Sequence, residues 1–335
     1  MPSFRTGTVQ EVLEHHPGLQ TLRVLVGDQL RTAILYPSHA APAVVGDRVV
    51  LNTTAVDLDL GTGGADFVVW NLAAESYDSL SGGHIMKLRY TPAQCDVLAV
   101  EAPESPDHVL MDSPGSLDLT PVVAASLHSQ LLPVVAAIRH RIPTARVAYV
   151  MTDGAALPAA LSKVVRRMRE LEWLCGVVTA GHAFGGDLEA VGVPSGVLAA
   201  KRVLGADVVV AGMGPGVVGT STRFGTSALE LATIVMAAKA VGGLPVVAVR
   251  MSSGDPRERH RGLSHHAVTA LGLVDPEGVQ VPVPGEAGAE VRSMLHRFQV
   301  VEVDTAPVRP LLDQAAGQGL EASHMGRTPP QDPLF

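Results

Sequence analysis

From about residue 96 the chain alternates short apolar runs with longer stretches of helical periodicity. The run "DVLAVE" (96–101) precedes "VVAASLHSQLLPVVAAIRHR" (122–141), and "RVAYVMTDG" (146–154) precedes "PAALSKVVRRMRELEWL" (158–174). This alternation is typical of βαβ units, in which crossover helices join parallel strands. We therefore predict an α/β fold whose larger domain, residues 96–317, has three layers and a mostly parallel sheet.

The first part of the chain has a different rhythm. Segments such as "TLRVLV" (21–26) and "DFVVWNL" (66–72) are short and β-branched, with Gly, Asp, Pro or Asn between them. They predict a small β-rich domain, a barrel or a sandwich, over residues 1–75. We expect residues 76–95 to form the joint and residues 318–335 to form a mobile tail.

Charge and hydropathy narrow the class of partner. The formal net charge is −8, and no basic run exceeds "KVVRRMR" (163–169), which disfavours nucleic acid. Apolar runs are interrupted before the roughly 18 residues of a membrane span, and the N-terminus lacks the layout of a signal peptide. We expect a cytoplasmic protein with a small-molecule ligand, and neither a nucleic-acid nor a membrane partner.

The stretch 228–241 is rich in alanine and apolar nearly all round, so as a helix it must be buried. Ser227 and Glu230 have the spacing of a capping box at its start. What buries this helix stays open at this point, and a homo-oligomer remains among the expected partners. Cys95 and Cys175 are too few and too far apart for a disulfide framework or a paired-thiol metal site.

Polar, glycine-rich segments follow four of the predicted strands. Ligands of open parallel sheets bind beyond the carboxyl ends of the strands, because loops and helix N-termini converge there. We therefore predict a ligand pocket at this rim. The four segments are "MTDGAALP" (151–158), "AGHAFGGDLE" (180–189), "GMGPGVVGTSTRFG" (212–225) and "RMSSGDPRERHRG" (250–262).

The third of these segments is a candidate anion cradle. Its backbone amides and the following helix favour negative charge, which gives ligand-binding roles to Gly214, Gly216, Gly219 and Thr220. The segment has no Gly-Lys-Ser/Thr ending, which disfavours the P-loop of a nucleoside-triphosphate site. Its glycines also miss the spacing G-x-G-x-x-G, which disfavours a dinucleotide oxidoreductase. A tight turn with close helix packing is the structural alternative.

The second segment sets His182 near two carboxylates, Asp187 and Glu189. A histidine base oriented by a carboxylate needs such groups, and Asp153 of the first segment is another candidate to orient it. The alternatives are an N-cap at Asp187, an Asp-Gly turn at Asp153, and a histidine bonded to backbone.

The segment "DPRERHRGLSHH" (255–266) concentrates charge in an otherwise apolar chain. Arg257 and Arg259 suit an anion, and His265 and His266, just after a predicted N-cap at Ser264, should stay neutral as base or ligand. Adjacent helical positions point about 100° apart, so we do not expect both histidines on one ion. A divalent metal is a further alternative, and a structural charge network is another. The predicted metal set is His182, Asp187, Glu189 and His260.

Several of these segments resemble a known bacterial family, the domain of unknown function 3866. The similar stretches are "MTDGAALP", "GHAFGGDLEAV", "GPGVVGT" and "RHRGLSHH", with "NTTAVDLDLGTGG" and "GHIMKLRYTP" nearer the N-terminus. The resemblance spans nearly the whole chain and implies no activity, cofactor or catalytic residue.

The local chemistry favours an enzyme of hydrolase or transferase type that binds a small anionic metabolite at the rim. A phosphorylated metabolite is one form of this hypothesis. In this hypothesis His182, His265, Asp187, Glu189 and Asp153 are catalytic, and Arg257, Arg259, His266 and the glycine segment bind the ligand. The alternatives are a non-catalytic ligand sensor or assembly protein, and a metal-dependent hydrolase.

Overall fold

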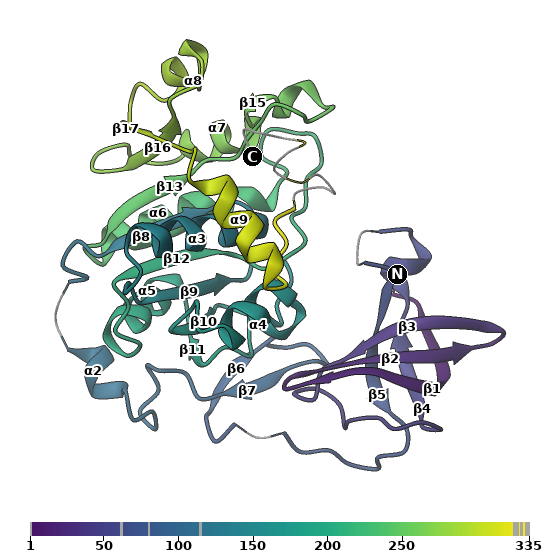
Figure 1. Ribbon diagram of the computed structural model, residues 1–335. Helices are drawn as coiled ribbons and strands as arrows, with labels where there is room; N and C mark the ends of the chain where they lie inside the picture. The colour runs from purple at the N-terminus through teal and green to yellow at the C-terminus, as the bar shows by residue number, and fades with distance from the viewer. Residues whose placement is uncertain are drawn as a thin grey trace. The chain divides into compact units, whose positions relative to one another are not determined.

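A computed structural model describes residues 2–60, 63–79, 81–113 and 116–323, with Thr328 and Gln331 (Figure 1). The chain divides into two compact units, Met1–Val97 and Leu98–Phe335. Within the described part of the chain, no helix has the length and apolar character needed to cross a bilayer. The cytoplasmic location stays a prediction.

The first unit is built on a closed five-stranded barrel, which confirms the β-rich N-terminal domain. Short β-branched strands alternate inward and outward side chains, and Leu22, Val24 and Leu51 fill the interior. A short helix, α1 (Thr54–Asp57), and a hairpin of β6 (Ile85–Lys87) and β7 (Cys95–Val97) complete the unit. Around the barrel the order is β1 (Phe4–His16), β2 (Leu19–Val26), β3 (Gln29–Leu35), β5 (Ala65–Asn71) and β4 (Arg48–Asn52).

The second unit contains an eight-stranded sheet in which every neighbouring pair is parallel, as the alternating sequence predicted. The order is β11 (Leu188–Ala190), β10 (Gly176–Ala180), β9 (Val147–Thr152), β12 (Val208–Met213), β8 (Pro121–Ala125), β13 (Leu244–Ala248), β16 (Gln280–Pro284) and β17 (Gln299–Val303). Strands β9 and β10 are buried throughout and mostly apolar, because helices cover both faces.

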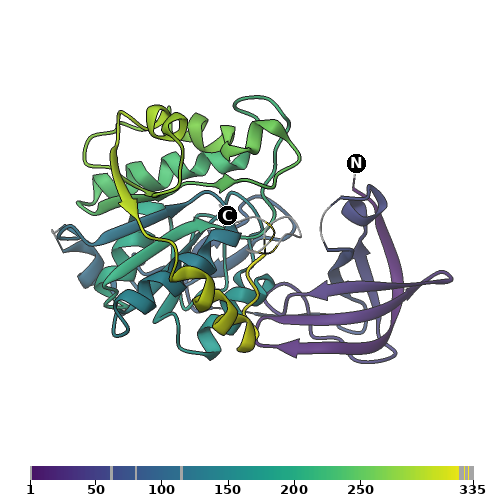
Figure 2. The same cartoon turned by 45° about the horizontal axis from the view of Figure 1, so that its top comes forward.

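Helices on both faces make this unit three-layered (Figure 2). One face packs against α3 (Leu131–Arg141), α4 (Lys163–Glu170) and α9 (Val308–Gly317). The other packs against α5 (Val193–Arg202), α6 (Glu230–Ala240) and α7 (His265–Leu271). Two shorter helices, α2 (His108–Asp112) and α8 (Ala289–Met294), pack on this second side through Met111 and Val291.

The alanine-rich helix α6 is buried within its own unit. Leu231, Ile234 and Val235 are inaccessible to solvent, because the sheet, α5 and α7 surround them. Its apolar surface therefore gives no argument for a second copy, and the homo-oligomer stays a prediction. The predicted tail begins with packed residues, since Leu320 is buried beside α9. Apart from Thr328 and Gln331, residues 324–335 lie outside the described part.

The strand order singles out the carboxyl end of β12. This strand lies between β9 and β8. The helices that follow these strands, α4 after β9 and α3 after β8, cover one face of the sheet. The helix that follows β12, α6, covers the other face. Ligands of open α/β sheets bind where neighbouring connections diverge in this way. The glycine-rich segment 212–225 starts at this position.

Candidate functional site

Loops after three neighbouring strands are joined at the carboxyl rim of the sheet. The backbone N–H of His182, after β10, donates to Asp153 Oδ2, after β9, at 2.9 Å. Ala156 N donates to Pro215 O, after β12, at 3.0 Å. These hydrogen bonds bring together the first three polar segments of the sequence at one edge.

The fourth segment leaves β13 and forms a small hairpin before α7 begins. Strands β14 (Met251–Ser252) and β15 (Gly262–Leu263) pair across the 3-10 helix η4 (Glu258–His260). At the start of α7, His266 packs on the glycine turn, where a Cβ built on Gly219 would lie 3.4 Å from His266 Cε1. The glycine turn and the histidine-arginine segment are therefore direct neighbours.

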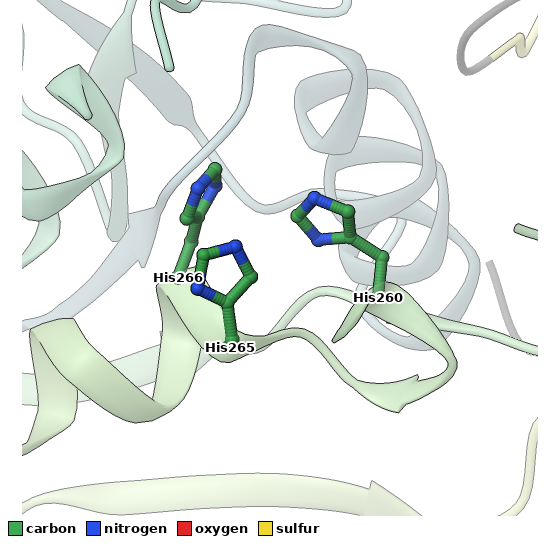
Figure 3. A group of neighbouring side chains, drawn as sticks. All are labelled: His260, His265 and His266. Atoms are coloured by element: carbon green, nitrogen blue, oxygen red, sulfur yellow. The ribbon is translucent and has the colours of Figure 1, made fainter. Parts of the chain in front are cut away.

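Three histidines of this segment form a cluster, which we call the histidine cluster: His260, His265 and His266. Their ring centroids lie 4.8, 5.0 and 4.1 Å apart, and the rings turn toward one another (Figure 3). One ring nitrogen from each lies within 4.8 Å of the other two. The expectation that His265 and His266 diverge was wrong. His265 is the first residue of α7, so no preceding turn restricts its ring, which reaches well beyond Cβ.

A buried ion network bonds to the histidine cluster through His260. Asp255, with no exposed side-chain surface, accepts two hydrogen bonds from the Arg257 guanidinium, one from the Arg257 backbone N–H, and one from Arg250 Nη2 at 2.6 Å. Arg250 Nη1 lies 2.7 Å from His260 Nδ1, and Ser264 Oγ lies 2.8 Å from the same nitrogen. Because a guanidinium only donates, Nδ1 of His260 is the acceptor in this contact. Both guanidinium groups pair with the same carboxylate, and these three groups together carry one positive charge.

Burial and the nearby arginines keep the cluster neutral. Burial, reinforced by Arg250, lowers the pKa of His260 to about 3. Burial also lowers the pKa of His266 to about 4, and it lowers that of His265, on which Arg259 acts in the same direction. Hydrogen bonds from Arg257 hold the pKa of Asp255 well below its usual range. At neutral pH the site therefore presents uncharged imidazoles beside a fixed positive charge.

Arg257 and Arg259, both predicted to bind the ligand, occupy different positions. Arg257 pairs with both oxygens of Asp255 through its Nε and Nη2, which gives it a structural role in the network. Arg259 is exposed, and its charge acts on His265 and His266. Among the described residues no carboxylate or carbonyl partner holds the Arg259 guanidinium, so its donors face solvent beside the cluster.

Asp187 and Glu189, the two carboxylates predicted near His182, both bond to strand β10. Asp187 Oδ2 accepts a hydrogen bond from Val177 N at 2.8 Å, and Asp187 also pairs with Arg169. Because β11 runs parallel to β10 and starts level with Val178, Asp187 lies at the amino end of β10. Glu189 Oε2 accepts from Thr179 Oγ1 at 2.7 Å.

These two carboxylates hold the returning loop in place. The loop runs back to the amino end of β10 before β11 begins, and that return separates Asp187 from the rim. This geometry corrects the prediction that Asp187 orients His182 or joins it and His260 around a metal. Glu189 lies level with Thr179 near the carboxyl end of β10 and also accepts from Gly185 N, so its predicted role stays a prediction.

The glycine segment mixes structural and rim positions. A Cβ on Gly214 would lie 2.4 Å from Ala156 O, so only glycine allows the two loops to approach. Gly216 has a φ of 101°, in the left-handed region that favours glycine. Thr220 closes a turn through two hydrogen bonds to Gly225 O, at 2.8 and 3.0 Å. The tight-turn alternative thus describes Gly214 and Thr220, whereas Gly219 lies against the histidine cluster.

Comparison with known proteins places the chain in a family. Residues 32–335 match the family described as protein of unknown function, DUF3866. The chain belongs to this family. No curated protein matches the chain significantly. The match confirms the resemblance that the rim segments suggested. Because the description of the family gives no activity, the chemistry of this DUF3866 chain follows from its own side chains.

One rim carboxylate of the DUF3866 chain was missed by the sequence reasoning. Glu230, the first residue of α6, packs its carboxyl group against Gly154, where a Cβ would lie 1.8 Å from Glu230 Oε2. Burial raises the pKa of Glu230, and the Asp153 carboxylate raises it further. The capping-box spacing with Ser227 had suggested a local role. Instead Thr226 Oγ1 accepts from Ala228 N, and Ser227 Oγ accepts from Val218 N.

We expect Gly154→Ala to lower the free energy of unfolding by about 1–3 kcal/mol, because the new methyl group overlaps the Glu230 carboxylate. Urea denaturation measures this loss. In a Glu230→Ala background the overlap disappears, so the same substitution should cost much less.

Gly288→Ala is the matched control, because a Cβ there meets no atom within 4 Å. Equal losses from Gly154→Ala with and without the Glu230 carboxylate would contradict the packing of Glu230 on this loop.

Proposed function

We propose that this chain binds a small anionic, phosphorylated metabolite at the carboxyl rim of its parallel sheet and acts on it as a hydrolase or transferase. The observation that carries the proposal is the contact of the glycine turn at Gly219 with His266, beside the exposed guanidinium of Arg259. Backbone amides in a glycine turn and an unpaired guanidinium both favour a phosphate or carboxylate.

The charge balance supports an anion. Arg250 and Arg257 both pair with Asp255, and Arg259 adds a further positive charge at the surface. A site with surplus positive charge attracts anionic ligands and holds them by charge-assisted hydrogen bonds. In the proposal Arg259 and the glycine turn bind the anion.

Proton transfer is assigned to His182. Its backbone is held on the rim by Asp153, and the loop that carries it follows β10. An imidazole can both accept and donate a proton, which is what a general base or acid must do. Glu230, with its raised pKa, is a second proton-bearing group on the same rim.

Binding is tested first with inorganic phosphate, by isothermal titration and by the shift in melting temperature. We expect Arg259→Ala to weaken phosphate binding at least tenfold. Arg297→Ala is the control, because Arg297 is an exposed arginine of the same unit whose charge acts on Asp275. Equal binding by the wild type and by Arg259→Ala would refute the anion site.

Turnover is tested next with a panel of phosphorylated metabolites. We expect His182→Ala to abolish turnover of an active compound while its binding survives. Binding of panel compounds with no turnover by the wild-type protein would overturn the enzyme and support a ligand sensor.

A further inference from the structure

We infer that His260, His265 and His266 form a binding site for a divalent transition metal ion that favours imidazole, such as Zn²⁺ or Co²⁺. The three side chains come from one short segment, with the 3-10 helix η4 supplying the first and the start of α7 supplying the other two (Figure 3). This set differs from the histidine-carboxylate set that the sequence suggested.

The spacing of the ring nitrogens fits an ion after a small adjustment. Imidazole nitrogens bind Zn²⁺ at about 2.0–2.1 Å, which sets the ligand nitrogens of a tetrahedral site about 3.3 Å apart. The three candidate nitrogens lie within 4.8 Å of one another. Modest side-chain rotations close the difference, because two of the three rings are only partly buried.

A second observation points to a ligand at the same place. Nε2 of His265 is buried and has no hydrogen-bond partner among the described residues. A buried polar atom without a partner is costly, and a metal ion or a bound group relieves that cost. His265 lies next to both other members, with centroid separations of 4.8 Å to His260 and 4.1 Å to His266.

The surrounding charge defines how such an ion is held. Three neutral imidazoles cancel none of its charge, and Arg250 donates to Nδ1 of His260, so the ion competes with a guanidinium. Three protein ligands leave a fourth position open, as in catalytic zinc sites. An anion in that position neutralises the ion, and Gly219 and Arg259 lie beside the cluster to hold it.

Metal and anion binding should therefore be coupled. Each ligand must strengthen the binding of the other by the same factor, because the coupling free energy is reciprocal. This coupling rests on the proposed anion site, whereas metal binding by the histidines does not. In such a site the ion would act as a Lewis acid toward the anion or activate a water molecule.

The test uses the full chain, freed of metal with a chelator and titrated with Co²⁺ alone. We expect one equivalent to bind with the visible absorption of a tetrahedral Co²⁺ site, and Zn²⁺ to displace it. His265→Ala and His266→Ala should each weaken binding at least tenfold. Absence of stoichiometric uptake, or equal uptake by these variants and the wild type, would refute the metal site.

His296→Ala serves as the control, since His296 is exposed and bonds to the carbonyl of Ser293. Circular dichroism checks that the variants fold, and the two partly buried histidines are chosen because His260 is buried in the ion network. His296→Ala should bind Co²⁺ as the wild type does, and an equal loss there would overturn the assignment.

Coupling is tested by repeating the Co²⁺ titration with inorganic phosphate present. We expect phosphate to lower the Co²⁺ dissociation constant at least tenfold, and Arg259→Ala to remove this effect while Co²⁺ still binds. Co²⁺ binding that ignores phosphate would refute the coupling and leave the metal site standing. Phosphate binding without Co²⁺ uptake would refute the metal site and leave the anion site standing.

Discussion

Replacing Asp255 with asparagine is expected to lower the free energy of unfolding by about 3–5 kcal/mol, because breaking a buried ion pair leaves charge without compensation. Asp255 has no exposed side-chain surface, and Arg250 is 5% exposed. The substitution keeps the size of the side chain, so the loss reports charge and hydrogen bonding. The asparagine amide would also direct a donor at guanidinium donors. Urea denaturation followed by circular dichroism measures the effect.

Asp275→Asn is the matched control. Asp275 pairs with Lys239 at the surface, where its side chain is 66% exposed. Solvent-exposed ion pairs contribute at most about 1 kcal/mol, so this variant should stay close to the wild type. Similar losses from the two substitutions would contradict the assignment of Asp255 as the buried anchor of the histidine-arginine segment.

His128 is expected to make the second unit less stable as the pH falls from about 6.5 to about 4. Burial lowers the pKa of His128 from 6.5 to about 4. Its Nε2 lies 2.7 Å from Ser162 Oγ, and its Nδ1 lies 3.3 Å from Met213 O, which together suit the neutral ring. Below pH 6.5 the unfolded chain takes up a proton that the folded chain refuses. The loss approaches about 3 kcal/mol near pH 4.

The measurement is the free energy of unfolding against pH for the wild type and for His128→Gln. The histidine cluster contributes in the same direction in both proteins, so only the difference between the two curves reports His128. We expect the His128→Gln curve to be flatter between pH 6.5 and 4, whatever its stability at pH 7. Two parallel curves would show that the buried ring does not resist protonation.

The local patterns of the chain were enough for the architecture. Strand and helix periods differ along the chain, and each period specifies which faces must be buried, so a barrel followed by a three-layer α/β unit was predictable. The polar segments at the ends of the parallel strands also marked one rim, because the direction of a strand fixes the edge at which its following loop begins. Hydrogen bonds between the loops at Asp153, His182, Ala156 and Pro215 agree with that reasoning.

The roles of single side chains were less accessible. Asp187 and Glu189 are near His182 in sequence, yet their loop returns along β10 and ties them to Val177 and Thr179. Glu230 matched a capping box, and only the approach of Gly154 showed where its carboxyl group lies.

The sequence by itself determined the class of fold and the edge of the sheet at which polar groups gather, because these depend on periodicity and strand direction. It also indicated the family, through the resemblance of whole segments. Only the tertiary structure showed that His260, His265 and His266 form one cluster, and that Asp255 forms ion pairs with Arg250 and Arg257. These residues all lie within 250–266, but ring orientation and ion pairing depend on how that segment folds into its hairpin and 3-10 helix, and spacing along the chain does not specify that folding.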